Sequence, residues 1–247
     1  MRPIGVFDSG IGGLSIVQSI IETLPCEDII YFADQKNIPY GEKSEEFLQN
    51  RSTEIVNFLL SKNCKLIVVA CNTATTMAIK ILRERFSCPI VGVEPAIKPA
   101  LEKTTGLIGV LTTVATSKSE KFNELIKKLD REKRVIVQPC PGLVEAIESS
   151  ESNLEVIDNL LKNFIQPLQS QNIESIVLGC THYPLIREAI SSSIGDKIQL
   201  IDSGEAVARE VKKQLMKNNI YSDIKELRKL QIYTSKSKEE LKNYSEA

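Results

Sequence analysis

Tryptophan is absent from this sequence, and histidine occurs once, as His182. The 247 residues include six cysteines, none of which belongs to a C-x-x-C pair. A zinc site requires several cysteine or histidine ligands at short spacings, and such spacings are missing. We therefore expect no metal site, and the cysteines remain as buried small side chains or as reactive thiols.

The sequence also lacks long apolar runs and an excess of either charge. No stretch has the roughly 20 apolar residues that cross a bilayer, and Asp8 interrupts the first apolar stretch before it reaches the length of a secretory signal. The formal net charge is -1, from 31 basic and 32 acidic residues, so we expect neither nucleic acid nor a membrane as partner. The protein is expected to be cytoplasmic, where reducing conditions disfavour structural disulfides.

What remains is the composition of a globular protein, with 42% apolar and 26% charged residues. Short apolar runs rich in β-branched residues alternate with longer amphipathic segments. The expected strands cover residues 4–7, 28–32, 65–70, 89–93, 107–111, 135–138, 175–178, 199–201 and 230–234. The expected helices cover residues 14–24, 44–62, 75–86, 117–128, 143–149, 154–169, 184–192 and 204–218. This alternation predicts an α/β fold with parallel sheets covered by helices on both faces.

The two halves of the chain resemble each other in sequence. Residues 4–10, IGVFDSG, resemble residues 108–113, IGVLTT. Residues 69–73, VACNT, resemble residues 178–182, LGCTH. Each half therefore has a strand followed by a polar turn and a helix, and later an apolar strand followed by a cysteine and a polar pair.

Duplicated halves predict two similar parallel-sheet α/β domains related by pseudo-symmetry. The carboxyl ends of their strands would converge on one active site in the cleft between them. We expect the first domain to comprise residues 1–95 and 208–247, and the second to comprise residues 96–207.

Cys71 and Cys180 occupy the same relative place in the two halves, each after a buried strand and before polar residues that can open a helix. The free N–H groups at a helix N-terminus favour a thiolate. If the halves face each other, one thiolate removes a proton from one face of a carbon and the opposing thiol donates a proton to the other face. The pair predicts a reversible one-step inversion of the stereocentre of a small amino acid.

Residues 8–13, DSGIGG, form a glycine-rich turn between the first strand and the first helix. Such a turn brings the backbone close to a carboxylate or phosphate, and Asp8 can bind an ammonium group or assist a thiol. A structural turn with Asp8 as helix N-cap is an equally good interpretation. His182 lies two residues after Cys180 and is a candidate proton-transfer aid. Glu145 is indicated by spacing alone as a solvated helix residue.

Five segments together resemble the signatures of bacterial glutamate racemases, in the order and spacing of that family. They are DSGIGGLS (8–15), ACNTAT (70–75), VEP (93–95), PGLVE (141–145) and GCTHYP (179–184). The resemblance implies a two-domain enzyme, in a homodimer, that interconverts L- and D-glutamate without pyridoxal phosphate, metal or other cofactor. It also implies that the product D-glutamate enters peptidoglycan. Glutamate as the substrate comes from the resemblance alone.

The resemblance also implies roles for single residues. Cys71 would abstract the proton from D-glutamate and Cys180 the proton from L-glutamate. The family's auxiliary acid/base positions match Asp8, Glu145 and His182. The substrate contacts of the family match Asp8, Ser9, Tyr40, Gly41, Asn72, Thr73, Thr113, Thr116, Thr181 and His182.

Three other functions fit parts of the pattern. A racemase of aspartate or another acidic amino acid would carry the same thiols. An actin-like or other phosphate-binding enzyme built on the Asp8 turn would need an acidic metal-binding set, and it would not explain two equivalent cysteines. A two-domain ligand-binding protein would explain a cleft, but it would leave the thiols unexplained.

Overall fold

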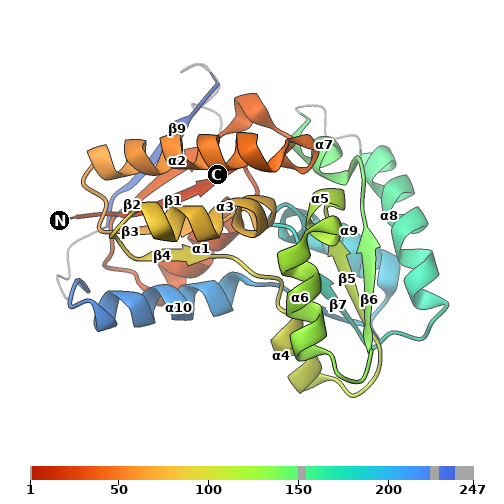
Figure 1. The fold of residues 1–247 in the computed structure, drawn as a ribbon. Helices are drawn as coiled ribbons and strands as arrows, with labels where there is room; N and C mark the ends of the chain where they lie inside the picture. Colours follow the sequence, from red (N-terminus) through yellow and green to blue (C-terminus); the bar gives the residue numbers. More distant parts are fainter. Residues whose placement is uncertain (1, 150–153, 223–227, 237–247) are drawn as a thin grey trace. The chain divides into compact units, whose positions relative to one another are not determined.

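The computed structural model describes residues 2–149, 154–222 and 228–236 (Figure 1). These residues form two compact units. The chain passes from the first unit to the second between Val93 and Glu94, and it returns between Ser203 and Gly204. Each unit contains one sheet in which all strand pairs are parallel. The predicted fold class, α/β with two parallel sheets, is confirmed.

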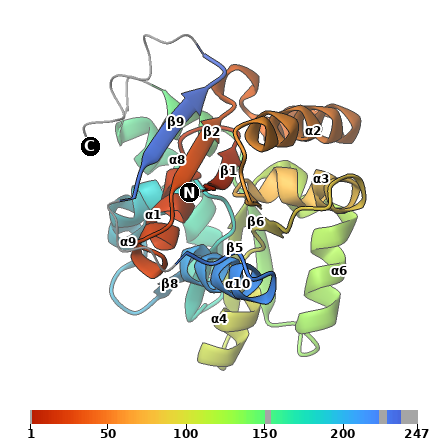
Figure 2. The ribbon, with the colours of Figure 1, turned by 90° about the vertical axis from the view of Figure 1, so that its left-hand side faces the viewer.

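The first unit contains a sheet with the strand order β4-β3-β1-β2-β9. Its strands are β1 (Ile4–Asp8), β2 (Ile29–Ala33), β3 (Leu66–Val69), β4 (Ile90–Gly92) and β9 (Leu230–Thr234). Its helices are α1 (Leu14–Thr23), α2 (Glu45–Ser61), α3 (Asn72–Arg85) and α10 (Gly204–Lys217), with short 3₁₀ helices η1 (Gln35–Asn37) and η2 (Tyr40–Glu42). Figure 2 shows β9 at the edge of this sheet, beside β2.

Alternation along β1 assigns its side chains to two apolar cores. Ile4 and Val6 are fully buried in the core that α1 and α10 share with the sheet. Phe7 is buried on the opposite face, in the core formed with α2 and α3. Gly5 points to the same face as Phe7, where a Cβ would lie 2.9 Å from the Ile67 side chain and 3.2 Å from that of Leu59. This close approach explains why a glycine occupies the middle of a buried strand.

The second unit contains a sheet with the order β6-β5-β7-β8. Its strands are β5 (Ile108–Thr112), β6 (Val135–Pro139), β7 (Ser175–Leu178) and β8 (Gln199–Ile201). Its helices are α4 (Ile97–Lys103), α5 (Val114–Lys118), α6 (Glu120–Leu129), α7 (Leu143–Glu148), α8 (Leu154–Gln169) and α9 (Arg187–Ile194), with the 3₁₀ helix η3 (Tyr183–Ile186). Ile97 and Phe122 bring α4 and α6 onto one face of the sheet. A Cβ on Gly109 would lie 2.9 Å from Leu168 of α8, which covers the other face.

The two sheets repeat one topology. The order β4-β3-β1-β2 in the first matches β8-β7-β5-β6 in the second, and β9 has no counterpart within the described part of the chain. The registers match as well, because Phe7 pairs with Val69 and Leu111 pairs with Leu178. The sequence similarity between the halves therefore joins residues at the same place in two equivalent sheets.

The last helix of each half packs in the other unit. α4 follows β4 of the first unit, but its residues Ile97 and Ala100 belong to the apolar core of the second. α10 follows β8 of the second unit, but Val207 and Leu215 complete the core beneath α1 in the first. Each unit therefore depends on a helix from the other half of the sequence.

The nine strands expected from the sequence are all present within the described ranges, whereas several helices differ from expectation. α4 was not expected, since Pro99 interrupts its short apolar pattern. The expected helix 117–128 is divided at Ser119, whose Oγ accepts a hydrogen bond from Phe122 N at 3.2 Å and caps α6. α3 begins at Asn72, three residues earlier than expected, because Cys71 caps it. Among the described residues, no helix is both long and apolar enough to span a membrane.

Candidate active site

Both thiols and the glycine-rich turn singled out by the sequence follow the carboxyl ends of central strands. β1 and β3 are neighbours, and their onward connections lead to β2 on one side and β4 on the other. β5 and β7 have the same relation to β6 and β8. In open parallel sheets such a switch point is where ligands bind. Asp8, Ser9 and Cys71 lie at the switch point of the first sheet. Thr113 and Cys180 lie at that of the second sheet.

Cys71 is the N-cap of α3 and is 5% exposed. Its Sγ accepts a hydrogen bond from Ala74 N at 3.5 Å, and its thiol lies 3.9 Å from Ser9 Oγ. The Ala74 N–H and the positive dipole end of α3 therefore stabilise negative charge on this sulfur. This is the environment that a thiolate base needs.

The glycine-rich turn after β1 is held by Asp8 and Tyr31. The fully buried Asp8 accepts a hydrogen bond from Gly10 N at 3.0 Å, and the Tyr31 hydroxyl donates to Gly10 O at 2.5 Å. A Cβ on Gly13 would lie 2.6 Å from Asp8 Cβ and 2.7 Å from the Tyr31 hydroxyl, so a larger residue would disrupt the turn. Gly13 is the N-cap of α1, which makes the N-cap interpretation of Asp8 wrong.

One buried polar group at the strand ends of each unit has hydrogen-bonding capacity that no described residue uses. Asn72 is 3% exposed, and its Nδ2 has no acceptor among the described residues. Thr112 is fully buried, and its Oγ1 likewise has no partner in the described part of the chain. Buried polar groups are costly when unpaired. Both groups are therefore suited to bind a polar ligand at the strand ends.

Cys180 is accompanied by a histidine and a carboxylate. Its Sγ lies 3.7 Å from His182 Nδ1, and His182 Nε2 lies 2.7 Å from Glu148 Oε1. The three side chains are buried or nearly so, with His182 1% and Glu148 9% exposed. A carboxylate only accepts hydrogen bonds, so Nε2 carries a proton, and in the neutral imidazole the Nδ1 lone pair then faces the thiol. This arrangement can take a proton from Cys180.

Glu148 was not among the residues expected from the sequence. Glu145, which the resemblance pointed to, lies exposed in the first turn of α7. Glu148 lies at the end of the same helix, four residues after the buried Val144, and so on the face that packs inward. That spacing is the signal in the sequence that distinguishes the two glutamates.

The surroundings of the two thiols are not equivalent. Cys71 opens an α-helix as expected, whereas Cys180 precedes a turn and the four-residue η3. Tyr183, the first residue of η3, is completely buried, and its hydroxyl donates to Thr112 O at 3.2 Å. This bond ties the segment after β7 to the end of β5. Burial, with smaller contributions from the nearby Cys180 and Cys140, raises the pKa of Tyr183 well above its usual value.

The other residues expected to contact substrate lie at the same sheet ends. Thr73 and Thr181 are buried beside their cysteines. Thr113 is the N-cap of α5, where its Oγ1 accepts from Thr116 N at 3.2 Å and donates to Thr116 Oγ1 at 3.0 Å.

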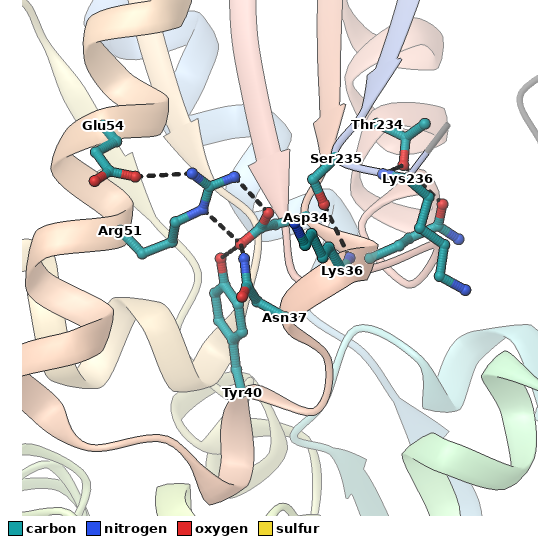
Figure 3. A network of polar contacts seen from close by, with 10 residues as sticks. Asp34, Lys36, Asn37, Tyr40, Arg51, Glu54, Thr234, Ser235 and Lys236 are labelled. Carbon is teal, nitrogen blue, oxygen red and sulfur yellow. Dashed lines mark hydrogen bonds and ion pairs between the residues drawn. The ribbon is translucent and has the colours of Figure 1, made fainter. Parts of the chain in front are cut away.

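Tyr40 and Gly41 lie in η2, beyond the end of β2. The Tyr40 hydroxyl donates to Asp34 Oδ2 at 2.7 Å (Figure 3). Burial and the negative charge of Asp34 raise the pKa of Tyr40, and the nearby Cys71 adds to the effect. Tyr40 and Cys71 belong to the same buried cluster on one face of the first sheet.

The six cysteines are free thiols. Burial raises the pKa of Cys64 and of Cys140 to about 12. No group of three or more His, Cys, Asp or Glu side chains within the described ranges is placed to hold a metal ion.

Comparison with known proteins places this chain among racemases. The model of the Asp/Glu/hydantoin racemase family matches residues 4–211. A glutamate racemase of Clostridium perfringens (strain SM101 / Type A) is 43% identical over 235 residues, which cover 94% of this chain and 90% of that protein. The crystal structure of glutamate racemase from Francisella tularensis in complex with D-glutamate has a TM-score of 0.83 at 33% identity, and covers 96% of this chain and 89% of its own. The crystal structure of Escherichia coli glutamate racemase in complex with L-glutamate and activator UDP-MurNAc-ala has a TM-score of 0.83 at 35% identity. The match covers 96% of this chain and 90% of the Escherichia coli chain.

Proposed function

The chain belongs to the Asp/Glu/hydantoin racemase family, and from this premise we propose that it is an isomerase that interconverts L- and D-glutamate. The observation that carries the proposal is the pair Cys71 and Cys180, which follow equivalent strands of two equivalent sheets. The structures of two relatives hold the D and the L enantiomer of glutamate respectively, and this supports glutamate as substrate.

The mechanism is a proton transfer between two thiols and one carbon. The Cys71 thiolate removes the Cα proton of D-glutamate, and the Cys180 thiol donates a proton to the opposite face to give L-glutamate. In the reverse direction Cys180 is the base and Cys71 the acid. Two groups of the same type suit a reaction between enantiomers of equal free energy, and the transfer requires no cofactor.

Each thiol has its own means of reaching the reactive state. The α3 N-terminus and Ser9 support the Cys71 thiolate, and Asp8 assists proton transfer on that side. His182 accepts the proton of Cys180, and Glu148 holds the imidazole in the tautomer that can do so. Glu148, rather than the exposed Glu145, is the auxiliary carboxylate on this side.

The carbanion formed at Cα needs donors where its charge develops. Asn72 Nδ2 is an unused buried donor beside Cys71, and Thr73 and Thr181 contribute hydroxyl groups. Ser9, Tyr40, Gly41, Thr113 and Thr116 complete the substrate contacts implied by the family. The expected cleft between the two domains stays a prediction.

The same proposal includes the biological setting. The D-glutamate produced supplies peptidoglycan synthesis, and the enzyme works in the cytoplasm as a homodimer. Light scattering coupled to size-exclusion chromatography measures the molar mass in solution. A homodimer should have twice the chain mass of 27.5 kDa.

The decisive experiment is exchange of the Cα proton in deuterium oxide without added cofactor. We expect deuterium at Cα of L- and D-glutamate, loss of optical activity from either enantiomer, and no comparable reaction with L-aspartate. The Cys71→Ser/Cys180→Ser double variant is the control for contaminating enzymes. Exchange into aspartate rather than glutamate would transfer the mechanism to the other acidic substrate, and no exchange into either would refute the proposal.

A further inference from the structure

Asp34 lies directly after β2, at the carboxyl end of the first sheet, and its side chain is completely buried. Both oxygens are used. Arg51 donates to Oδ1 from Nη2 at 2.7 Å and to Oδ2 from Nε at 2.9 Å. Oδ2 also accepts from the Tyr40 hydroxyl at 2.7 Å and from Asn37 Nδ2 at 2.9 Å. Figure 3 shows the side chains of Arg51, Tyr40 and Asn37 converging on this carboxylate.

The charges of this cluster fix the direction of its hydrogen bonds. Burial alone would raise the pKa of Asp34, but the hydrogen bonds from Arg51, Tyr40 and Asn37 outweigh it and hold the pKa below 3.8. Asp34 is therefore ionised at neutral pH, and Tyr40 must donate to it. A two-pronged Arg–carboxylate pair is both strong and directional. Arg51, on α2, thus fixes the orientation of Asp34, and Asp34 fixes the ring of Tyr40.

The turn between Asp34 and Tyr40 is also held from the C-terminal strand. Thr234 Oγ1 at the end of β9 donates to Gln35 Oε1 at 2.9 Å, and Lys36 N donates to Ser235 Oγ at 2.9 Å. Among the described residues, β9 has no counterpart in the second sheet. The first unit therefore has a reinforcement around this turn that is not part of the repeated topology.

We propose that Arg51 is a positioning residue for substrate binding, acting through Asp34 to hold Tyr40 and Gly41 in the place where they contact the substrate. The inference rests on the proposed function, since it takes Tyr40 and Gly41 as substrate contacts. The hydrogen bonds of the Arg51 guanidinium go to Asp34 and Glu54. The thiols follow β3 and β7, and they are supported by other residues.

A KM-against-kcat comparison distinguishes this role from a structural one. A segment that binds the substrate and its transition state equally well affects KM and not kcat. A variant that loosens such a segment therefore raises KM and leaves kcat nearly unchanged. Loss of folded protein lowers the apparent kcat and leaves KM unchanged. Arg51 also pairs with the exposed Glu54 at 2.8 Å, so Glu54→Gln is a matched control that removes the outer partner only.

The experiment measures kcat and KM from both enantiomers for wild type, Arg51→Met, Arg51→Lys, Glu54→Gln, Tyr40→Phe and the Arg51→Met/Tyr40→Phe double variant. We expect Arg51→Met to raise KM about tenfold in both directions with kcat changed less than about threefold. Arg51→Lys keeps the charge without the two-pronged geometry and should be intermediate. Glu54→Gln should match wild type.

The double variant decides whether Arg51 acts through Tyr40. Its KM should exceed that of the more impaired single variant by less than about twofold, because both changes break one chain of contacts. Multiplicative effects, or an unchanged KM in Arg51→Met, would overturn the inference. If Arg51→Met does not fold, Arg51→Lys, Tyr40→Phe and their double variant give the same test. Wild type inactive on glutamate would refute the proposed function, whereas active wild type with unaffected Arg51 variants would refute this inference alone.

Discussion

Glu148 Oε1 and His182 Nε2 lie 2.7 Å apart, although 34 positions separate the two residues in the sequence. The pair turns Nδ1 of the histidine toward the Cys180 thiol. Cys71, in the equivalent place of the other sheet, has instead the N-terminus of α3. The two halves thus share their topology but support their thiols by different chemistry.

The first prediction separates the two glutamates of α7. Glu148→Gln should lower kcat/KM by about tenfold to a hundredfold, because the imidazole loses the charged partner that fixes its tautomer. Glu145→Gln should stay within about twofold of wild type, since its side chain is exposed. Initial rates from L-glutamate measure both. The opposite ranking would return the auxiliary role to Glu145.

The second prediction concerns the thiols. Cys71→Ser and Cys180→Ser should each abolish racemisation, because a serine hydroxyl is too weakly acidic to replace a thiolate base. Cys26→Ser and Cys88→Ser are the controls and should keep most activity. Polarimetry with D-glutamate provides the readout. Turnover by either of the first two variants would remove that cysteine from the mechanism.

The third prediction concerns the difference between the two faces. His182→Asn should lower kcat more in the L-to-D direction, which Cys180 begins, and Asp8→Asn should lower it more in the D-to-L direction. The equilibrium constant is fixed, so kcat/KM must fall equally in both directions for each variant. Full progress curves from each enantiomer separate kcat from KM. Equal losses of kcat in both directions would contradict the assignment of the helpers.

The fourth prediction is a pH dependence of stability that comes from Asp34. Its pKa in the folded protein is below the ordinary 3.8, so its stabilising effect is complete above about pH 4 and is lost as the pH falls through the lower, folded-state value. Asp34→Asn should lower the free energy of unfolding by about 2–4 kcal/mol at pH 7. The difference from wild type should shrink below about pH 4.

Urea unfolding midpoints between pH 3 and pH 7 test the Asp34 prediction. Glu54→Gln serves as its control, because Glu54 is 66% exposed and its pair with Arg51 should contribute little at any pH. A difference for Asp34→Asn that stays constant down to pH 3 would contradict the assignment.

Local sequence determined the elements and the thiol pair. The strands could be predicted because each buried strand is a short β-branched run, and apolar periodicity depends only on near neighbours. The repeat placed Cys71 and Cys180 in equivalent positions, and the matching registers of β1–β3 and β5–β7 agree with it. The Asp8 turn could be predicted for the same reason, although its capping residue could not.

Tertiary packing decided the rest. The spacing from Val144 places Glu148 on the inward face of α7, but only tertiary packing brings its carboxylate to His182. Asp34 and Arg51 are 17 positions apart, and their pairing depends on how α2 lies over the end of β2. These contacts join residues distant in sequence, and their free energy depends on burial that exists only once the units have folded.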